Sequence, residues 1–259
     1  MMMKKFSLKA IVLLVLVISV VSYKNRRKNS IVRDDTVFLV GTSDDYPPYT
    51  FNQNGKIVGF DIDLARAVAE FLGKKFVIQN MSFSVLLLDL DRDVVQMIAA
   101  GISPRKTAIN VLYTDPYITG DPFLVITRSD SFSDESIPET IKELFGKKVA
   151  VNEGYTSDFY ISRYPQIELV RLETVAECIL ALKTKKVDFF VVAQTVMQPF
   201  FELNVLTDFK QKVLQDLFES YAFVVSGKNS VLFDDVQRAL KALKENGTVD
   251  LLKKKWKLS

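Results

Sequence analysis

Histidine is absent from the 259 residues, and Cys178 is the only cysteine. Histidine is the commonest general base at neutral pH and the commonest metal ligand, so its absence argues against triad hydrolysis and zinc chemistry. A lone cysteine cannot form an internal disulfide. Cys178 lies in the helical pattern Thr174–Lys183, where we expect a buried structural thiol. Neither a metal site nor a cofactor is predicted.

The chain also lacks a strong excess of either charge, with 34 basic and 31 acidic residues. The basic excess gathers at the two ends, in Lys24–Lys28 and Lys253–Lys257. No central basic face with interleaved aromatic residues exists, so nucleic-acid binding is not expected. Hydrophobic residues make up 48% of the chain. This is enough for a real core in one large domain or in two lobes of roughly 100–130 residues each.

The beginning of the chain has the pattern of an export signal. A short basic segment, Met1–Lys9, precedes the apolar run Ala10–Val21. The run is shorter than the ~20 residues that a comfortable membrane span needs. It is typical of a secretory signal peptide with a cut after Ser22, and an uncleaved N-terminal anchor is the alternative. Either interpretation places the rest in the periplasm or otherwise outside the cytoplasm, and residues 1–30 are set apart from the fold.

Strand and helix patterns alternate along the exported part. The first series consists of strands at Thr36–Thr42, Phe76–Gln79 and Val94–Ala99, helices at Asp61–Leu72 and Ser84–Asp91, and a hairpin at Phe51–Gly59. The second consists of strands at Lys148–Val151, Glu168–Leu172 and Asp188–Val192 and helices at Thr156–Tyr164 and Thr174–Lys183, before a helical end at Val231–Trp256. Two such series predict an α/β protein with two lobes, each a mainly parallel sheet flanked by helices.

Ligands of open α/β sheets bind beyond the carboxyl ends of the strands. This rule selects four loops, which are Thr42–Tyr49, Ala99–Lys106, Asn152–Thr156 and Ala193–Gln198.

Three aspartates invite a catalytic interpretation, but none is predicted to be catalytic. Helix capping and a first-turn charge explain Asp61 and Asp63 better. Asp115 is expected to be a structural loop residue.

Several motifs occur in a fixed order over about residues 36–259. They are Tyr46–Tyr49 (YPPY), Gly59–Ala65 (GFDIDLA), Ala100–Ser103 (AGIS), Tyr113–Tyr117 (YTDPY), Gly146–Val151 (GKKVAV), Gly154–Thr156 (GYT), Leu243–Thr248 (LKENGT) and Lys254–Trp256 (KKW). Together they resemble the polar-amino-acid-binding proteins of ABC transporters, family 3 of the periplasmic solute-binding proteins.

The resemblance implies a two-lobed periplasmic-binding-protein fold of type II, in which the chain crosses between the lobes twice through a hinge. The crossings are expected near Pro122–Thr127 and Tyr221–Ser226. Lobe 1 would comprise residues 31–124 and 224–259, and lobe 2 residues 125–223. The protein is expected to be a monomer.

The resemblance also implies a ligand site. Tyr46 and Phe83 would be aromatic walls, and Ser103 would offer a hydroxyl to the ligand's ammonium and carboxylate groups. Asn152 and Thr156 would contribute from the second lobe, with Thr156 at a helix N-terminus, a natural anion site. The remaining members of the expected set are Ser43, Asp44, Ala100, Gly101, Arg105, Lys106 and Gln194.

One departure from the family pattern concerns the ligand carboxylate. Members usually read Ser/Thr-Ile-Thr-Pro-x-Arg, and this arginine clamps the carboxylate. The loop is shorter here, at Ser103–Thr107. Arg105 is the preferred clamp because its planar fork fits a carboxylate, and Lys106 is the alternative.

Other departures concern the ligand ammonium. Ala193, followed by Gln194, stands where many members carry an aspartate. In the first loop, Ser43 replaces an acidic or amide residue. We therefore expect weak binding of common α-amino acids, or a ligand whose cation is placed differently. A guanidinium that reaches Asp44, Asp45 or Glu153 is one option.

The implied function is an extracytoplasmic solute-binding protein that captures an amino acid or a related small polar solute and delivers it to an ABC transporter permease. The alternatives are an enzyme on the same fold, similar to cyclohexadienyl dehydratase, and a sensor or ligand-free descendant. The cleft loops offer an enzyme mainly Asp44, Asp45 and Glu153, without a histidine partner, so binding is preferred and no catalytic residue is predicted.

Overall fold

The computed structural model describes residues 34–202 and 206–258. The chain divides into two compact units, residues 1–37 and 38–259. In the described part of the first unit, the backbone N–H and the hydroxyl of Thr36 both donate to the Asp34 carboxylate. The signal expected at residues 1–30 lies outside the described residues. No helix in the described ranges is long and apolar enough to cross a membrane.

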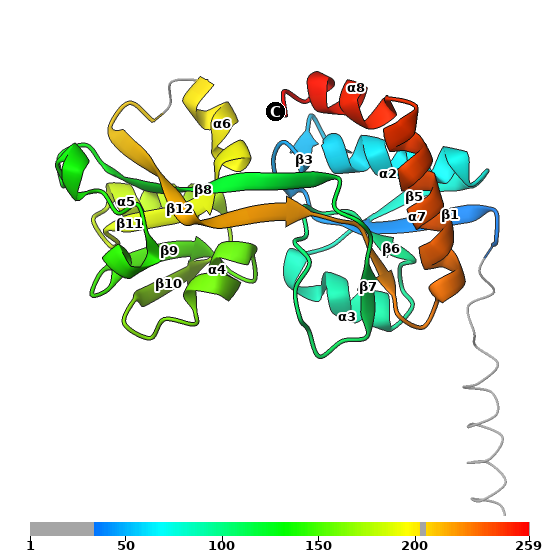
Figure 1. The fold of residues 1–259 in the computed structure, drawn as a ribbon, viewed down its shortest axis with the longest axis horizontal. Helices are drawn as coiled ribbons and strands as arrows, with labels where there is room; N and C mark the ends of the chain where they lie inside the picture. Colours follow the sequence, from blue (N-terminus) through cyan, green and yellow to red (C-terminus); the bar gives the residue numbers. More distant parts are fainter. Residues whose placement is uncertain (1–33, 203–205, 259) are drawn as a thin grey trace, which may run out of the picture. The chain divides into compact units, whose positions relative to one another are not determined.

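The first lobe is built on a five-stranded sheet in the order β5-β1-β6-β13-β7 (Figure 1). Strand β1 pairs parallel with β6, whereas β13 pairs antiparallel with β6 and β7. The bounds are β1 Val37–Thr42, β5 Lys75–Asn80, β6 Met97–Ile98, β7 Val111–Tyr113 and β13 Val224–Ser226. A small separate sheet consists of β2 Asp45–Tyr46, β3 Thr50–Gln53 and β4 Lys56–Val58.

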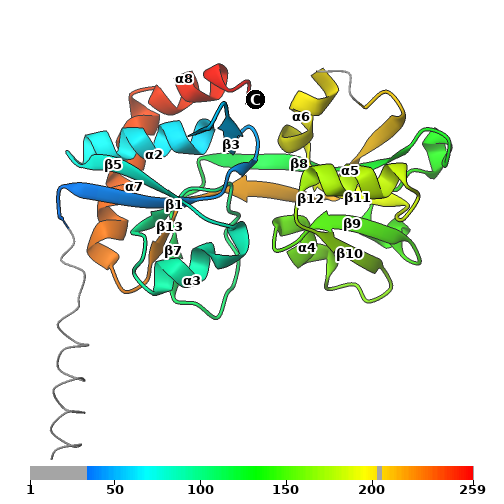
Figure 2. The ribbon, with the colours of Figure 1, turned by 180° about the vertical axis from the view of Figure 1, so that it is seen from behind.

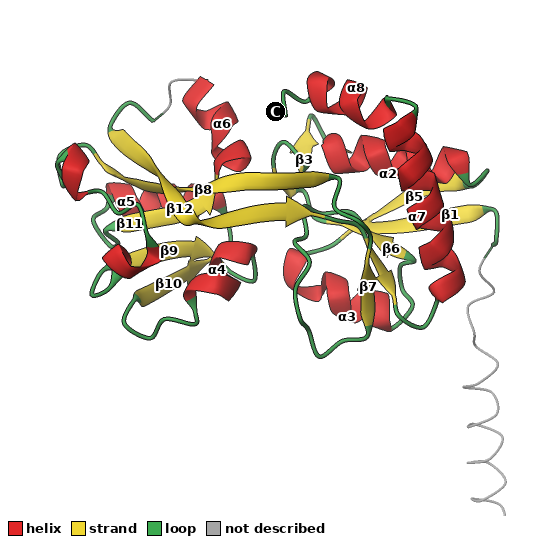
Figure 3. Cartoon of the chain, in the orientation of Figure 1, coloured by secondary structure: helices red, strands yellow, loops and turns green. Residues whose placement is uncertain are grey.

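Helices flank the first sheet (Figure 3). They are α2 Phe60–Phe71, α3 Leu86–Asp91, α7 Ser230–Glu245 and α8 Thr248–Lys255, and η1 Phe83–Val85 is a short 3₁₀ turn before α3. Helix α2 begins after Gly59, whose φ is 139° and where a Cβ atom would lie 2.0 Å from the Tyr49 carbonyl oxygen. Only glycine fits there. The expected cap by Asp61 is wrong, because Gly59 is the N-cap and Asp61 is fully buried.

The second lobe is built on a sheet in the order β10-β9-β11-β8-β12. Strands β9 Lys148–Asn152, β10 Glu168–Leu172 and β11 Phe189–Ala193 are parallel, and β8 Ile118–Arg128 and β12 Phe209–Tyr221 add an antiparallel edge. The helices are α4 Thr156–Ile161, α5 Val175–Lys183 and α6 Gln194–Glu202, with 3₁₀ turns η2 Asp134–Ser136 and η3 Ile141–Leu144. Figure 2 shows α5 in front of this sheet. Cys178 is buried, as expected, and burial raises the pKa of its thiol to about 12.

Within residues 38–259 the chain passes between the two sheets twice, from β7 to β8 and from β12 to β13. Strands β8 and β12 pair antiparallel along most of their length, with Glu219 opposite Asp121 and Tyr221 opposite Ile118. The pairing shifts register between Leu214 and Phe218. These paired strands are called the hinge strands below. The lobe boundaries expected from the sequence stay a prediction.

Candidate ligand-binding site

An aromatic stack joins the two lobes. The Tyr155 ring, from the loop before α4, lies between two aromatic residues of the first lobe. Its centroid is 4.1 Å from that of Phe83 and 4.7 Å from that of Tyr46. Tyr46 is 3% exposed and also stacks on Tyr49. The two walls expected for the ligand therefore enclose a side chain of the protein itself.

Sequence reasoning missed Tyr155. A bulky aromatic residue directly after Gly154, in a loop expected to line the cleft, was the available signal. Its hydroxyl donates to Asp45 Oδ1 at 3.2 Å, so the ring is also fixed at its outer end.

Asp61 organises the turn that carries Ala100 and Gly101. Its Oδ2 accepts hydrogen bonds from the Gly101 N–H at 2.7 Å and the Tyr117 hydroxyl at 2.6 Å. Burial raises the pKa of this carboxyl group to about 7, although both hydrogen bonds oppose the shift. Gly101 has a φ of 59°, and a Cβ atom there would lie 2.7 Å from the Tyr46 ring. The turn thus supports Tyr46, and the Gly101 N–H is engaged within the protein.

Glu219, on hinge strand β12, brings together several of the expected ligand residues. Glu219 is 1% exposed, and its carboxyl group accepts hydrogen bonds from the hydroxyls of Ser103 at 2.9 Å and Tyr46 at 3.3 Å. Thr156 adds a further side-chain hydrogen bond. Burial raises the pKa of Glu219 to about 7, opposed by the hydrogen bonds and reinforced by the nearby Asp121.

Asp121 lies opposite Glu219 on the other hinge strand and is 5% exposed. It accepts hydrogen bonds from the Thr195 hydroxyl and backbone N–H. The Tyr221 hydroxyl lies 3.0 Å from Asp121 Oδ2 and 2.9 Å from Glu219 Oε2, so it donates to one acid at a time. Burial raises the pKa of Asp121. Within residues 34–202 and 206–258, no lysine or arginine forms an ion pair with either acid.

An acidic cavity of about 510 Å³ opens beside the aromatic stack, between loops of both lobes. Its described lining residues are Ser43, Asp44, Asp45, Asn80, Met81, Ser82, Phe83, Ser84, Glu153, Tyr155, Glu173 and Thr174. Four of these carry carboxyl groups, and none of the described lining residues is a lysine or arginine. Asp44 and Asp45 are half-buried, whereas Glu153 and Glu173 are exposed. This cavity can accept a cation and stack it against aromatic rings.

The two candidates for the carboxylate clamp lie elsewhere. Arg105 donates from Nη1 to the Gly154 carbonyl oxygen at 2.6 Å and reaches the Phe159 ring at 5.7 Å. Lys106 is exposed, and both residues line a different cavity of about 500 Å³ that also contains Arg163. In this structure Arg105 holds the Gly154–Tyr155 loop against the first lobe.

The remaining expected residues are placed as follows. Asn152 is buried at the end of β9, and its Nδ2 lies 3.5 Å from the Glu173 carbonyl oxygen. Ala100 and Ala193 are buried, and Gln194 is exposed at the start of α6. The structure thus brings Tyr46, Ser103 and Thr156 to Glu219 and places Ser43, Asp44 and Phe83 at the acidic cavity. Arg105, Lys106 and Gln194 lie outside both groups.

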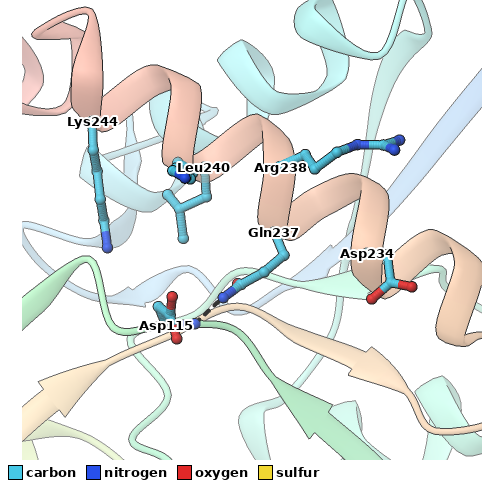
Figure 4. A pocket seen from close by; sticks show the side chains of 7 residues that line it. Asp115, Asp234, Gln237, Arg238, Leu240 and Lys244 are labelled. Carbon is cyan, nitrogen blue, oxygen red and sulfur yellow. Dashed lines mark hydrogen bonds between the residues drawn. The ribbon is translucent and has the colours of Figure 1, made fainter.

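Among the described residues, no group of three or more His, Cys, Asp or Glu side chains is placed so that it could hold one metal ion. A cavity of about 390 Å³ follows α7, where Gln237 accepts a hydrogen bond from the Asp115 backbone at 3.0 Å (Figure 4). None of the expected ligand residues lines it.

Two sheet-based lobes joined by paired hinge strands, with a polar cavity lined from both lobes, define a two-lobed solute-binding protein. Residues 38–259 match the family model for bacterial extracellular solute-binding proteins, family 3. The chain belongs to this family. This match confirms the expected fold class and the resemblance to polar-amino-acid-binding proteins. It also confirms the interpretation as an extracytoplasmic solute-binding protein of the ABC-transporter type.

The chain is similar to several characterised proteins. The arginine-binding extracellular protein ArtP of Bacillus subtilis is 28% identical over 226 residues, which cover 84% of this chain and 85% of ArtP. An ancestral arginine-binding protein, solved with arginine bound, is 28% identical with a TM-score of 0.76 and coverage of 86% and 99%. The ancestral amino-acid-binding protein AncCDT-1, a precursor of cyclohexadienyl dehydratase, is 26% identical with a TM-score of 0.74 and coverage of 85% and 95%.

Proposed function

We propose that this protein captures a small solute with a guanidinium or ammonium side group, a cationic amino acid or its close relative, for an ABC transporter permease. The acidic cavity carries the proposal. Its four carboxyl groups come from the first lobe, at Asp44 and Asp45, and from the second lobe, at Glu153 and Glu173. A cation between them would offset their mutual repulsion and favour the approach of the two lobes.

The aromatic lining supports a guanidinium in particular. This group is planar, stacks on aromatic faces and presents five N–H donors to surrounding carboxylates. Phe83 and Tyr155 supply rings at the cavity, and Tyr155 donates to Asp45. ArtP and the ancestral protein are named for arginine, which agrees with this choice.

Thermal unfolding with single ligands tests the proposal, because a ligand that binds only the folded state raises Tm. We expect arginine to raise Tm. Citrulline, which has the same shape without the side-chain charge, is expected to have a much smaller effect, and glutamate none. A larger shift with citrulline or glutamine than with arginine would contradict a cationic ligand.

The lobe boundaries, the monomeric state and the choice between a cleaved signal and an N-terminal anchor remain part of the proposal. Size-exclusion chromatography with light scattering tests the monomer. Fractionation of the expressed full chain, followed by N-terminal sequencing, decides between a cleaved signal and an anchor.

An enzyme on the same fold is the second candidate. Glu219 favours it, because a carboxyl group with a pKa of about 7 suits a general acid, and AncCDT-1 is a dehydratase precursor. We nevertheless infer binding without turnover, since Glu219 is 1% exposed and its partners are protein hydroxyls. Incubation with a cyclohexadienyl carboxylate, followed by the ultraviolet absorbance of an aromatic product, decides this. Turnover that is lost in Glu219→Gln would establish the enzyme.

A further inference from the structure

The hydroxyls expected to hold the ligand's polar groups are occupied by the protein. Ser103 and Thr156 were predicted to contact the ligand, and both donate to Glu219 instead. Each hydroxyl has one hydrogen to donate. A ligand carboxylate placed at these two hydroxyls would therefore compete with Glu219 for the same hydrogen atoms.

We infer that Glu219 determines the specificity of this cleft, and that it makes the cleft favour cations without a carboxylate group over α-amino acids. The inference rests on the proposed function, because it names which cationic solutes fit the same cleft. Agmatine, which is arginine without its α-carboxyl group, is the simplest ligand of this kind.

Electrostatics around Glu219 supports the inference. Asp121 already faces it across the hinge strands, and a third carboxylate in this buried place would add like-charge repulsion. An ammonium group would instead find two acids that form no ion pair with any described residue. The arginine that would otherwise clamp a carboxylate, Arg105, donates to the Gly154 carbonyl oxygen.

A ligand that reaches Glu219 from the acidic cavity would have to displace Tyr155. The Tyr155 ring stacks on Tyr46, whose hydroxyl contacts Glu219, and its own hydroxyl contacts Asp45 at the acidic cavity. A flat cation that displaces this ring would lie between Phe83 and Tyr46. A second cationic group on the same molecule would then point towards the hinge strands, as the amine of agmatine does when its guanidinium faces the cavity.

The protonation of Glu219 gives the inference a pH signature. The titratable groups around Glu219 are Asp121 from β8, Tyr46 from β2, Tyr155 before α4, Tyr221 from β12 and Tyr49. The pKa of Glu219 is raised to about 7. Above this pH the group gains a negative charge, so agmatine should bind more tightly while arginine should gain less or lose affinity.

Calorimetric titration of the exported protein with arginine and agmatine tests this at pH 6 and pH 8. At pH 8 we expect agmatine to bind at least about tenfold more tightly than arginine, which corresponds to about 1.4 kcal/mol. Argininamide, in which a neutral carboxamide replaces the carboxylate of arginine, should bind like agmatine. Glu219→Gln keeps the size and an acceptor oxygen, and it should reduce the preference to about threefold or less.

Glu153→Gln is the matched control. Glu153 lines the acidic cavity and is exposed. Its neutralisation should therefore weaken the binding of arginine and of agmatine by similar factors and leave the ratio of the two affinities unchanged. Circular dichroism establishes whether each variant folds. If Glu219→Gln does not fold, the ratio of the two affinities in the wild type at pH 6 and pH 8 decides. A rise of this ratio with pH requires a titrating carboxyl group beside the ligand, and a constant ratio would overturn the inference.

The inference is overturned if arginine binds as tightly as agmatine at pH 8, or if the agmatine-to-arginine affinity ratio is unchanged in folded Glu219→Gln. Either result leaves the proposed function intact. Tight binding of agmatine without binding of arginine would support the inference and restrict the proposed function to amines. Binding of neither ligand would overturn both.

Discussion

Two buried carboxyl groups of this protein both have a raised pKa but lie in different surroundings. Asp61 and Glu219 are both desolvated, and both carboxyl groups have a pKa raised to about 7. The partners of Asp61, Gly101 and Tyr117, hold a turn beneath Tyr46. Glu219 instead contacts the first lobe through Ser103 and the second lobe through Thr156. A buried acid is therefore a candidate for function when its partners come from elements that must separate to admit a ligand.

The strongest test of this contrast is Asp61→Ala. The change leaves the Gly101 N–H and the Tyr117 hydroxyl buried without their acceptor, so we expect the free energy of unfolding to fall by about 2–5 kcal/mol. The agmatine-to-arginine affinity ratio should stay unchanged. Urea unfolding at pH 5, where the Asp61 carboxyl group is still protonated in the folded state, measures the stability, and calorimetry measures the affinity ratio.

Asp63→Ala is the control in the same turn of α2. Asp63 accepts hydrogen bonds from Lys255 and from the Trp256 indole near the surface, so its loss should cost only about 1 kcal/mol. If Asp61→Ala loses no more stability than Asp63→Ala, Asp61 does not hold the turn as described. If Asp61→Ala changes the agmatine-to-arginine affinity ratio, its role is not separate from that of Glu219.

The next effect is the pH dependence of stability. Both acids bind a proton more strongly in the folded state than in the unfolded state, where their pKa values are near 4. Their contribution to stability is therefore fully present below about pH 4 and is lost as pH rises to about 7. We expect each of these two groups to lower the free energy of unfolding by about 2–3 kcal/mol between pH 5 and pH 8.

Urea unfolding across this range, in the wild type and in Asp61→Asn, separates the two acids. The asparagine variant should lose part of the slope, because it cannot titrate. A wild-type stability that rises from pH 5 to pH 8, with the same slope in the variant, would contradict the burial of protonated acids.

The smallest effect concerns Tyr155. Tyr155→Phe keeps the ring between Phe83 and Tyr46 and removes the hydrogen bond to Asp45. We expect a loss of stability of about 0.5–1.5 kcal/mol and tighter agmatine binding, because the ring leaves the stack more easily and Asp45 becomes available. Thermal unfolding and calorimetry give both values. Weaker agmatine binding would instead make the Tyr155 hydroxyl part of the ligand site.

The fold could be predicted well where local patterns decide it. The apolar spacing of α2, the strand at β11 and the break at Gly247 between α7 and α8 all follow from the sequence. Hinge strand β12 was missed, because its register shift between Leu214 and Phe218 interrupts the alternation that indicates a strand.

The site could be predicted only in part. The loops and their residues Tyr46, Phe83 and Ser103 were selected by topology and resemblance, but their partners were not. Tyr46 and Glu219 lie 173 positions apart, and Ser103 and Glu219 lie 116 apart. Such contacts depend on how the hinge strands place side chains from both lobes, which periodicity in one segment does not contain. Asp61 shows the same limit, because its inward orientation depends on Tyr117, 56 residues away.

The number of protons released on ligand binding is the most direct test of whether a cation binds beside Glu219. At pH 7 about half of the Glu219 groups are protonated, since their pKa is about 7. An ammonium group beside Glu219 should expel about half a proton per agmatine, measured by calorimetry in two buffers of different ionisation enthalpy. The account predicts this release in the wild type and its loss in Glu219→Gln. Binding without proton release in the wild type, or equal release in both proteins, would contradict it.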